Sequence, residues 1–275
     1  MLPITDFMKQ EYAIEAALLG IFMVLLGIFA TLFFSPVSPL DPFLPDNFLR
    51  RIPMGIVMGA IATAIVYSPW GKRSGAHTNP AVSLTFFRLG KLSAKDTFFY
   101  AIAQFIGGTV GVILVSLLLG KAFTDAPINY LVTLPGQFGA IIAFITEFLL
   151  SFGLMLMVLF TSNINQLSKY TGIFAGILVA IYIVIAVPIS GMSINPARSF
   201  ASALPAHLWT AFWVYYFGPL LGMLAAGELY SHYPHKPKTI CYKLCPNGEQ
   251  ECTISNCCGN CDYLIRYWRT EDKSE

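Results

Sequence analysis

The sequence predicts an all-α membrane protein in which six transmembrane helices enclose two shorter re-entrant half-helices. Hydrophobic residues make up 56% of the 275 residues and charged residues only 12%, about half the charged fraction that is usual in a soluble domain. Six long apolar runs follow one another along the chain, and the tripeptide Asn-Pro-Ala occurs twice at matching positions. This composition argues against aqueous enzymes, nucleic-acid-binding proteins and disordered scaffolds.

The apolar runs are continuous rather than alternating, which favours helices over the strands of a barrel. A helix of about 20 residues crosses the roughly 30 Å of hydrocarbon in a bilayer. The first run is too long for the apolar region of a cleavable signal peptide, so we expect it to remain as a span. The six expected spans are Ile14–Phe34, Ile52–Tyr67, Phe98–Leu119, Phe138–Phe160, Gly172–Ile189 and Trp209–Tyr230.

The basic residues between the spans predict the orientation, because cytoplasmic loops are enriched in Lys and Arg. With six crossings both termini share a side. The opposite side receives only Arg50, Arg51 and Lys121, apart from an arginine assigned to the pore below. We therefore expect a multi-pass cell-membrane protein with cytoplasmic termini, whose terminal side carries Lys9, Lys72, Arg73, Arg88, Lys91, Lys95, Lys169, Lys236, Lys238 and Lys243.

The chain contains an internal repeat, at about residues 10–120 and 138–232. Each half has two spans, a short segment that contains Asn-Pro-Ala, and a third span. Because three spans is an odd number, the second copy enters the bilayer from the opposite face. The two short segments, Asn79-Pro80-Ala81 and Asn195-Pro196-Ala197, are then half-helices that meet near the midplane. Such interrupted segments at matching positions indicate a permeation or binding site.

These residues suit a pore. Asparagine is a favoured N-cap and proline a favoured first helical residue, so we expect Asn79 and Asn195 to cap the half-helices and to leave their side-chain NH₂ groups free to face a passage. Two such donors bind one water oxygen and orient the water chain, while two helix N-termini oppose cations. The loops before the caps should line the pore with backbone carbonyls, at Gly75, Ala76, His77, Gly191 and Ser193.

Three charged residues of the apolar part of the chain are candidates for a functional or structural role. Arg198 follows the second cap directly, and a guanidinium at membrane depth indicates function. Glu15 and Glu147 recur in the first span of each half. They suit either the proton relay of a transporter or a structural role, in which they accept hydrogen bonds from the re-entrant loops, and we favour the structural role.

The two motifs, Ser74-Gly-Ala-His-Thr-Asn-Pro-Ala-Val and Gly191-Met-Ser-Ile-Asn-Pro-Ala-Arg-Ser, resemble those of the aquaporin (major intrinsic protein) family over about residues 10–232. The resemblance implies a homotetramer with one pore in each protomer, no cofactor and no reaction. It also implies a selectivity filter made of Ile183, Met192, Arg198 and a residue of the second span. Ungapped counting gives Gly59 for that residue, and a slip of one or two positions gives Met58 or Val57.

The resemblance favours water over larger solutes, but not strictly. Ile183 stands where strict water channels commonly have histidine, so exclusion of larger solutes is in question. Ser199, in place of the aspartate usual in glycerol facilitators, and the pair Tyr215-Tyr216 favour water. We expect a passive channel in the lipid bilayer for water and small neutral solutes. A glycerol facilitator is the main alternative, and a secondary transporter and a membrane-anchored metalloprotein are the others.

The chain changes character after residue 233. We divide it into a channel domain, residues 1–233, and a Cys-rich cytoplasmic tail, residues 234–275. A reducing compartment disfavours stable disulfides, and clustered thiolates suit Zn²⁺ or an iron–sulfur cluster. Disulfide or redox chemistry and a disordered tail stay open. The candidate ligands are Cys241, Cys245, Cys252, Cys257, Cys258 and Cys261.

Overall fold

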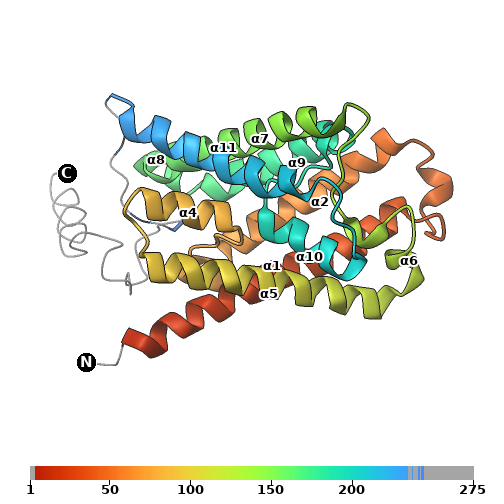
Figure 1. Ribbon diagram of the computed structural model, residues 1–275, viewed down its shortest axis with the longest axis horizontal. Helices are drawn as coiled ribbons and strands as arrows, with labels where there is room; N and C mark the ends of the chain where they lie inside the picture. The colour runs from red at the N-terminus through yellow and green to blue at the C-terminus, as the bar shows by residue number, and fades with distance from the viewer. Residues whose placement is uncertain (1–3, 235–236, 238–240, 242, 245–275) are drawn as a thin grey trace, which may run out of the picture.

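The fold is a bundle of long helices that run side by side along the length of the molecule (Figure 1). The computed structural model describes residues 4–234, 237, 241, 243 and 244. Within this part of the chain the long helices are α1 (Ile4–Phe34), α2 (Asn47–Tyr67), α5 (Ala94–Leu119), α7 (Gly139–Ser162), α9 (Thr171–Ser190) and α11 (Phe212–His232).

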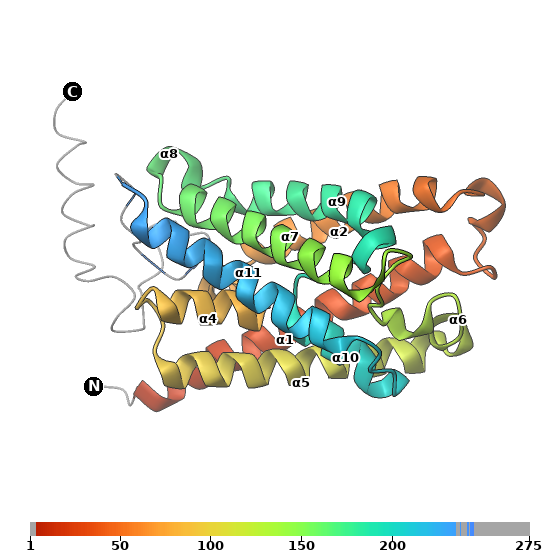
Figure 2. The same cartoon turned by 45° about the horizontal axis from the view of Figure 1, so that its top comes forward.

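Two short helices, α4 (Pro80–Arg88) and α10 (Pro196–Ala206), lie inside the bundle and begin at the two Asn-Pro-Ala motifs. They start near the middle of the bundle and run toward opposite ends (Figure 2). This is the arrangement predicted for two re-entrant half-helices. The remaining short elements are α3 (Pro69–Ser74), α6 (Lys121–Thr124), α8 (Asn165–Ser168) and the 3₁₀ turns η1 (Asp41–Phe43) and η2 (Asn129–Leu131).

Among the described residues, five of the long helices are apolar and long enough to cross a bilayer: the segment Gln10–Phe34 of α1, and α2, α5, α7 and α9. The sixth expected span forms α11, which has 21 residues. Its tyrosines, tryptophan, glycines and Glu228 make it less apolar than the other five. The six predicted runs therefore all form long helices, although only five have the hydropathy of a typical span.

Several helices extend beyond their apolar runs, because polar caps rather than hydropathy fix where they begin. The Asp46 side chain accepts a hydrogen bond from Phe48 N and caps α2. Ser93 Oγ accepts from Asp96 N at 3.0 Å and caps α5. A capping side chain satisfies an amide that has no partner within the helix, so the first turns of α2 and α5 form ahead of the apolar segments.

The long helices pack in three intimate pairs: α1 with α5, α7 with α11, and α2 with α9. The first two pairs correspond under the internal repeat, and the third joins the two halves. Glycine allows these approaches. A Cβ on Gly107 of α5 would lie 2.0 Å from the carbonyl oxygen of Ala16 in α1, and a Cβ on Gly222 of α11 would lie 2.3 Å from that of Phe148 in α7. Small residues at such contacts are typical of membrane helices.

Helix α1 begins and α11 finishes at the same end of the bundle, which we call the terminal end (Figure 1). Helices α4 and α8 also lie toward this end, whereas α6 and η1 lie at the opposite end. The basic residues Arg88 in α4 and Lys169 beside α8 are therefore at the terminal end. Lys121 in α6 and Arg50, which pairs with Asp41 of η1 at 2.7 Å, are at the opposite end.

Candidate functional site

The site forms where the N-termini of α4 and α10 meet. Asn79 has an extended backbone, and its Oδ1 accepts from Ala81 N at 2.9 Å. Asn195 Oδ1 accepts from Ala197 N at 3.0 Å and from Arg198 N at 3.3 Å. Both asparagines thus form the helix caps that the sequence predicts, and the prolines that follow occupy the first helical position, where no amide donor is needed.

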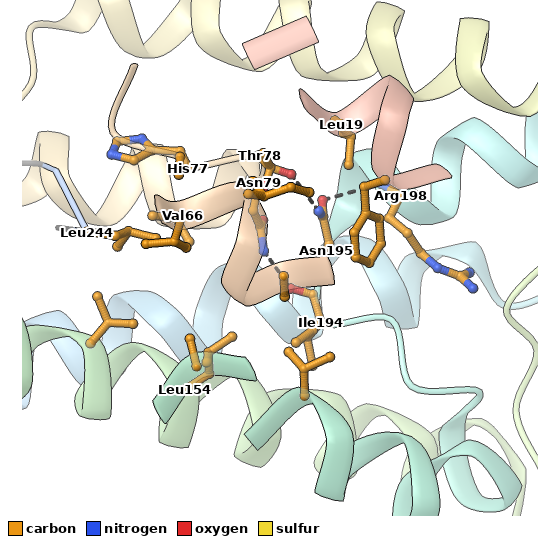
Figure 3. A pocket seen from close by; sticks show the side chains of 18 of the residues that line it. Leu19, Val66, His77, Thr78, Asn79, Leu154, Ile194, Asn195, Arg198 and Leu244 are labelled. Carbon is orange, nitrogen blue, oxygen red and sulfur yellow. Dashed lines mark hydrogen bonds between the residues drawn. The ribbon is translucent and has the colours of Figure 1, made fainter. Parts of the chain in front are cut away.

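The amide groups of the two asparagines hold the halves of the chain together (Figure 3). Asn79 Nδ2 donates to the carbonyl of Ile194 at 2.8 Å, and Asn195 Nδ2 donates to the carbonyl of Thr78 at 2.7 Å. The expectation that these NH₂ groups are entirely free was therefore wrong, because the carbonyls before each cap lie within reach of the opposite cap. A side-chain amide has two N–H donors, so each asparagine keeps one for another acceptor.

Glu15 of α1 organises the loop that leads to Asn79. The carboxylate is fully buried. Its Oε1 accepts from His77 N at 3.0 Å and from Ser74 Oγ at 2.6 Å, and its Oε2 accepts from Thr78 N at 2.6 Å and from Gln104 Nε2 at 2.8 Å. Four donors compensate the loss of hydration that a buried carboxylate suffers.

Glu147 of α7 repeats this arrangement in the second half. It is also fully buried, and it accepts from Ser190 Oγ at 2.7 Å, Ser193 N at 2.9 Å and Ile194 N at 2.6 Å. Each glutamate thus binds a serine and two successive loop amides in its own half. These hydrogen bonds join each carboxylate to the re-entrant loop of its own half, which is the contact expected for a structural role.

The two loops have an unusual backbone that these carboxylates stabilise. In addition to Gly75 and Gly191, the residues Ala76, Thr78, Met192 and Ile194 have positive φ, between 45° and 55°. Such a conformation is unfavourable for residues with a Cβ and most of all for β-branched ones. The hydrogen bonds from the loop amides to Glu15 and Glu147 hold it in place, and the carbonyls of Thr78 and Ile194 are thereby presented to the opposite asparagines.

A cavity of about 150 Å³ runs past both asparagines, which is room for several water molecules at about 30 Å³ each. Most of its wall is apolar, and its polar groups lie on the two loops and caps. Figure 3 shows Arg198 and His77 on opposite sides of the asparagine pair. The polar lining residues are His77, Thr78, Asn79, Ser193, Asn195 and Arg198; the apolar ones include Leu19, Phe22, Leu26, Val66, Leu154, Met155, Val158, Val179, Ile183, Met192, Ile194, Met223 and Leu244.

Arg198 is the only lysine or arginine among the described residues that line this cavity. Its Nη1 donates to the carbonyl of Leu131 at 2.9 Å. Leu131 belongs to η2, where Asn129, Tyr130 and Leu131 all have positive φ, and this turn brings the carbonyl to the guanidinium. An arginine has five N–H donors, so the contact fixes the side chain and leaves others for a solute.

Comparison with known proteins identifies the family. The sequence pattern of the protein family described as "Major intrinsic protein" matches residues 8–230. The chain belongs to the major intrinsic protein family. It is 36% identical over 178 residues to a probable NIP-type aquaporin of Nicotiana alata, covering 64% of this chain and 63% of that protein. It is 30% identical over 217 residues to aquaporin NIP1-1 of Arabidopsis thaliana, covering 77% of this chain and 73% of that protein.

The chain thus spans less than two thirds of the length of its Nicotiana relative. Among solved structures, the aquaglyceroporin of Plasmodium falciparum matches with a TM-score of 0.66 and 22% identity, covering 82% of this chain and 96% of that one. At this identity the likeness concerns the fold, which is that of the major intrinsic proteins.

Of the three candidates for the filter residue of the second span, Gly59 lies at a helix contact and Met58 in the apolar core. Gly59 packs against α9: a Cβ there would lie 2.4 Å from the carbonyl oxygen of Gly176, so the residue serves the contact between α2 and α9. Met58 is fully buried and belongs to the apolar cluster that contains Ile183 and Met192.

His77 has a fixed place in this member of the family. Its Nδ1 lies 2.9 Å from Ser83 Oγ, and its ring stacks on Phe86 with centroids 5.1 Å apart and contacts Tyr100 edge-on at 5.4 Å. The ring is 2% exposed. It thus forms part of the wall, held on several sides.

Sequence reasoning missed several partners of these residues. Ser83 and Ser199 each lie four residues after a capping asparagine, and Ser199 Oγ is 2.6 Å from Ser193 Oγ. Tyr100 donates to Ser74 O and Tyr215 to Ser190 O, both at 2.7 Å. Their recurrence at equivalent positions of the two repeats was the signal that could have revealed them. Tyr215 therefore fixes a loop, and neither Tyr215 nor Tyr216 lines the cavity.

The tail differs from the metal-site expectation where it is described. Cys241 is disulfide-bonded, so its sulfur is not the thiolate that Zn²⁺ would need. The other candidate ligands, Cys245, Cys252, Cys257, Cys258 and Cys261, lie outside the described residues.

Proposed function

We propose that this chain is a passive channel for water and small uncharged solutes that excludes protons and other ions. The observation that carries the proposal is the pair of capping asparagines, cross-linked by hydrogen bonds in the wall of one cavity. Each retains one N–H donor, and two donors on opposite sides of a water oxygen turn its hydrogens toward its neighbours. Two converging helix N-termini add positive potential, and Arg198 adds a full charge. No chemical reaction and no cofactor are part of this proposal.

The narrow part of the pathway would be formed by Ile183, Met192 and Arg198, which line the cavity, together with Met58, which belongs to the same apolar cluster as Ile183 and Met192. Three apolar side chains and one guanidinium give a wall that can accept a solute with both an apolar and a hydroxyl-bearing side. Glycerol is therefore the second candidate. Ser199 does not distinguish the two solutes through the cavity wall, because its hydroxyl is occupied by Ser193 and Thr133.

We further propose the setting of this channel. The Lys and Arg bias supports a cytoplasmic location of the terminal end, and the apolar helices support insertion of the chain in a membrane. Residues 1–233 would form the channel domain and residues 234–275 a tail that follows it. A homotetramer is the expected assembly, which native mass spectrometry in detergent would test.

Reconstitution tests the function directly. Full-length protein in proteoliposomes should accelerate osmotic shrinkage, with a low activation energy and without any ion gradient, and a pH-sensitive dye inside should report no added proton flux. The same vesicles in a glycerol gradient measure the second candidate. Water flux that requires a sodium or proton gradient would instead indicate a secondary transporter.

A further inference from the structure

Two described residues beyond α11, Pro237 and Leu244, are hydrogen-bonded to the bundle. Pro237 O accepts a hydrogen bond from the hydroxyl of Tyr230, a fully buried residue of α11. Further along, Leu244 N donates to the carbonyl of Gly75 at 3.2 Å. Gly75 opens the loop that leads to Asn79, so a residue of the tail is bonded to the pore loop itself.

Three of the described tail residues, Cys241, Lys243 and Leu244, are buried. Cys241 is 4% exposed and Leu244 7% exposed, and both belong to an apolar cluster with Val66, Val158 and Met223. The cluster includes residues from α2, α7 and α11, which surround the cavity at its terminal end. A segment attached only to the outer surface of the bundle would not bury leucine to this degree.

Leu244 forms part of the cavity wall. Figure 3 shows it beside Val66, on the side of the asparagine pair away from Arg198. Its apolar cluster includes the cavity-lining residues Val66 and Val158. His77, also in the wall, is held by Ser83 and Phe86, and the neighbouring Lys243 is buried. An apolar constriction stops permeation by excluding water, without a need to fill the passage completely.

We propose that Leu244 is an autoinhibitory closure of the pore at its terminal end. In this closed state the Leu244 side chain occupies the mouth, and its backbone bond to Gly75 holds it there. Release of Leu244 opens the mouth without any change in the asparagine pair. The inference rests on the proposed channel function and adds a regulatory device to it.

The test compares full-length wild type, Leu244→Asp and Leu244→Ala in proteoliposomes at equal protein density. A carboxylate is disfavoured in this apolar mouth, so Leu244→Asp should raise water permeability on the order of tenfold if the closed state dominates, and Leu244→Ala should raise it less. Leu229→Ala is the matched control, because Leu229 is 49% exposed on α11 and should leave flux unchanged. Hydrogen exchange should show the Leu244 amide protected in wild type and less protected in Leu244→Asp.

The outcomes separate the two proposals. Equal, non-zero flux in wild type and in a monodisperse Leu244→Asp protein overturns the closure and leaves the channel. If Leu244→Asp does not fold, the same comparison with Leu244→Ala decides. Vesicles that stay impermeable to water with every variant overturn the channel, and the closure with it.

Discussion

The side-chain amide of Asn79 donates a 2.8 Å hydrogen bond to the carbonyl of Ile194, a residue 115 positions further along the chain. The reciprocal bond, from Asn195 to Thr78, closes a small symmetric unit at the centre of the bundle. The loops can offer these carbonyls only because buried glutamates bind the loop amides. The residues of the proposed permeation site thus also join the two halves of the bundle.

The substitution Asn79→Asp should convert ion exclusion into cation leakage. The introduced carboxylate would keep the oxygen that caps α4 but would lose the donor to Ile194 O and place a negative charge beside the cavity. Proton and sodium flux in proteoliposomes measures the leak. The Asn79→Asp substitution is introduced both into the wild-type chain and into the Leu244→Asp chain. Asn163→Asp is the control, because Asn163 also donates to a carbonyl, Leu159 O at 2.7 Å, but does not line the cavity. If Asn79→Asp were as impermeable to protons and sodium as wild type, Asn79 would not contribute to ion exclusion.

Glu15→Gln should destabilise the protein. The new NH₂ group cannot accept a hydrogen bond, so at least one of the donors Ser74, His77, Thr78 and Gln104 loses its partner. Each buried group left unsatisfied costs about 1–3 kcal/mol. Thermal unfolding in detergent should show a clear loss of stability, with a similar loss for Glu147→Gln.

The control for both glutamates is Glu228→Gln. Glu228 pairs with Arg88 at 2.6 Å, but the two side chains are 40% and 60% exposed, and such surface pairs contribute only about 0–1 kcal/mol. If Glu228→Gln were as damaging as Glu15→Gln, loss of negative charge rather than loss of loop contacts would explain the effect.

The sequence was sufficient to predict the long helices, the half-helices and their caps, because each depends on local signals: apolar length, Asn followed by Pro, and the repeat. It was insufficient for Gly59, whose role depends on which face of α2 meets Gly176 of α9. It also could not reveal that the NH₂ groups of the asparagines cross to the opposite loop. That contact joins residues of different halves, and no spacing within one half encodes it.

The filter assignment makes opposite predictions for two neighbouring residues. Met58→Ala should widen the pathway and raise the ratio of glycerol to water permeability, since it removes most of a buried side chain. Gly59→Ala should instead reduce stability, because its Cβ would lie 2.4 Å from Gly176 O, and should leave the ratio unchanged in the protein that folds. Paired glycerol and water measurements, with unfolding curves for both variants, check this. A changed ratio for Gly59→Ala alone would restore Gly59 to the filter.

Arg198→Met tests the charge in the cavity wall. Methionine retains part of the length of arginine but removes its charge and its donor to Leu131 O. Because no other described lysine or arginine lines the cavity, the barrier to protons and cations should fall, and each reduction of about 1.4 kcal/mol raises the leak tenfold. Water permeability should be retained or increased. Arg88→Met is the matched control, since Arg88 is exposed and pairs with Glu228 away from the cavity. Ion leaks indistinguishable among wild type, Arg198→Met and Arg88→Met would show that exclusion does not depend on this guanidinium, and would leave the asparagine pair and the helix N-termini as its source.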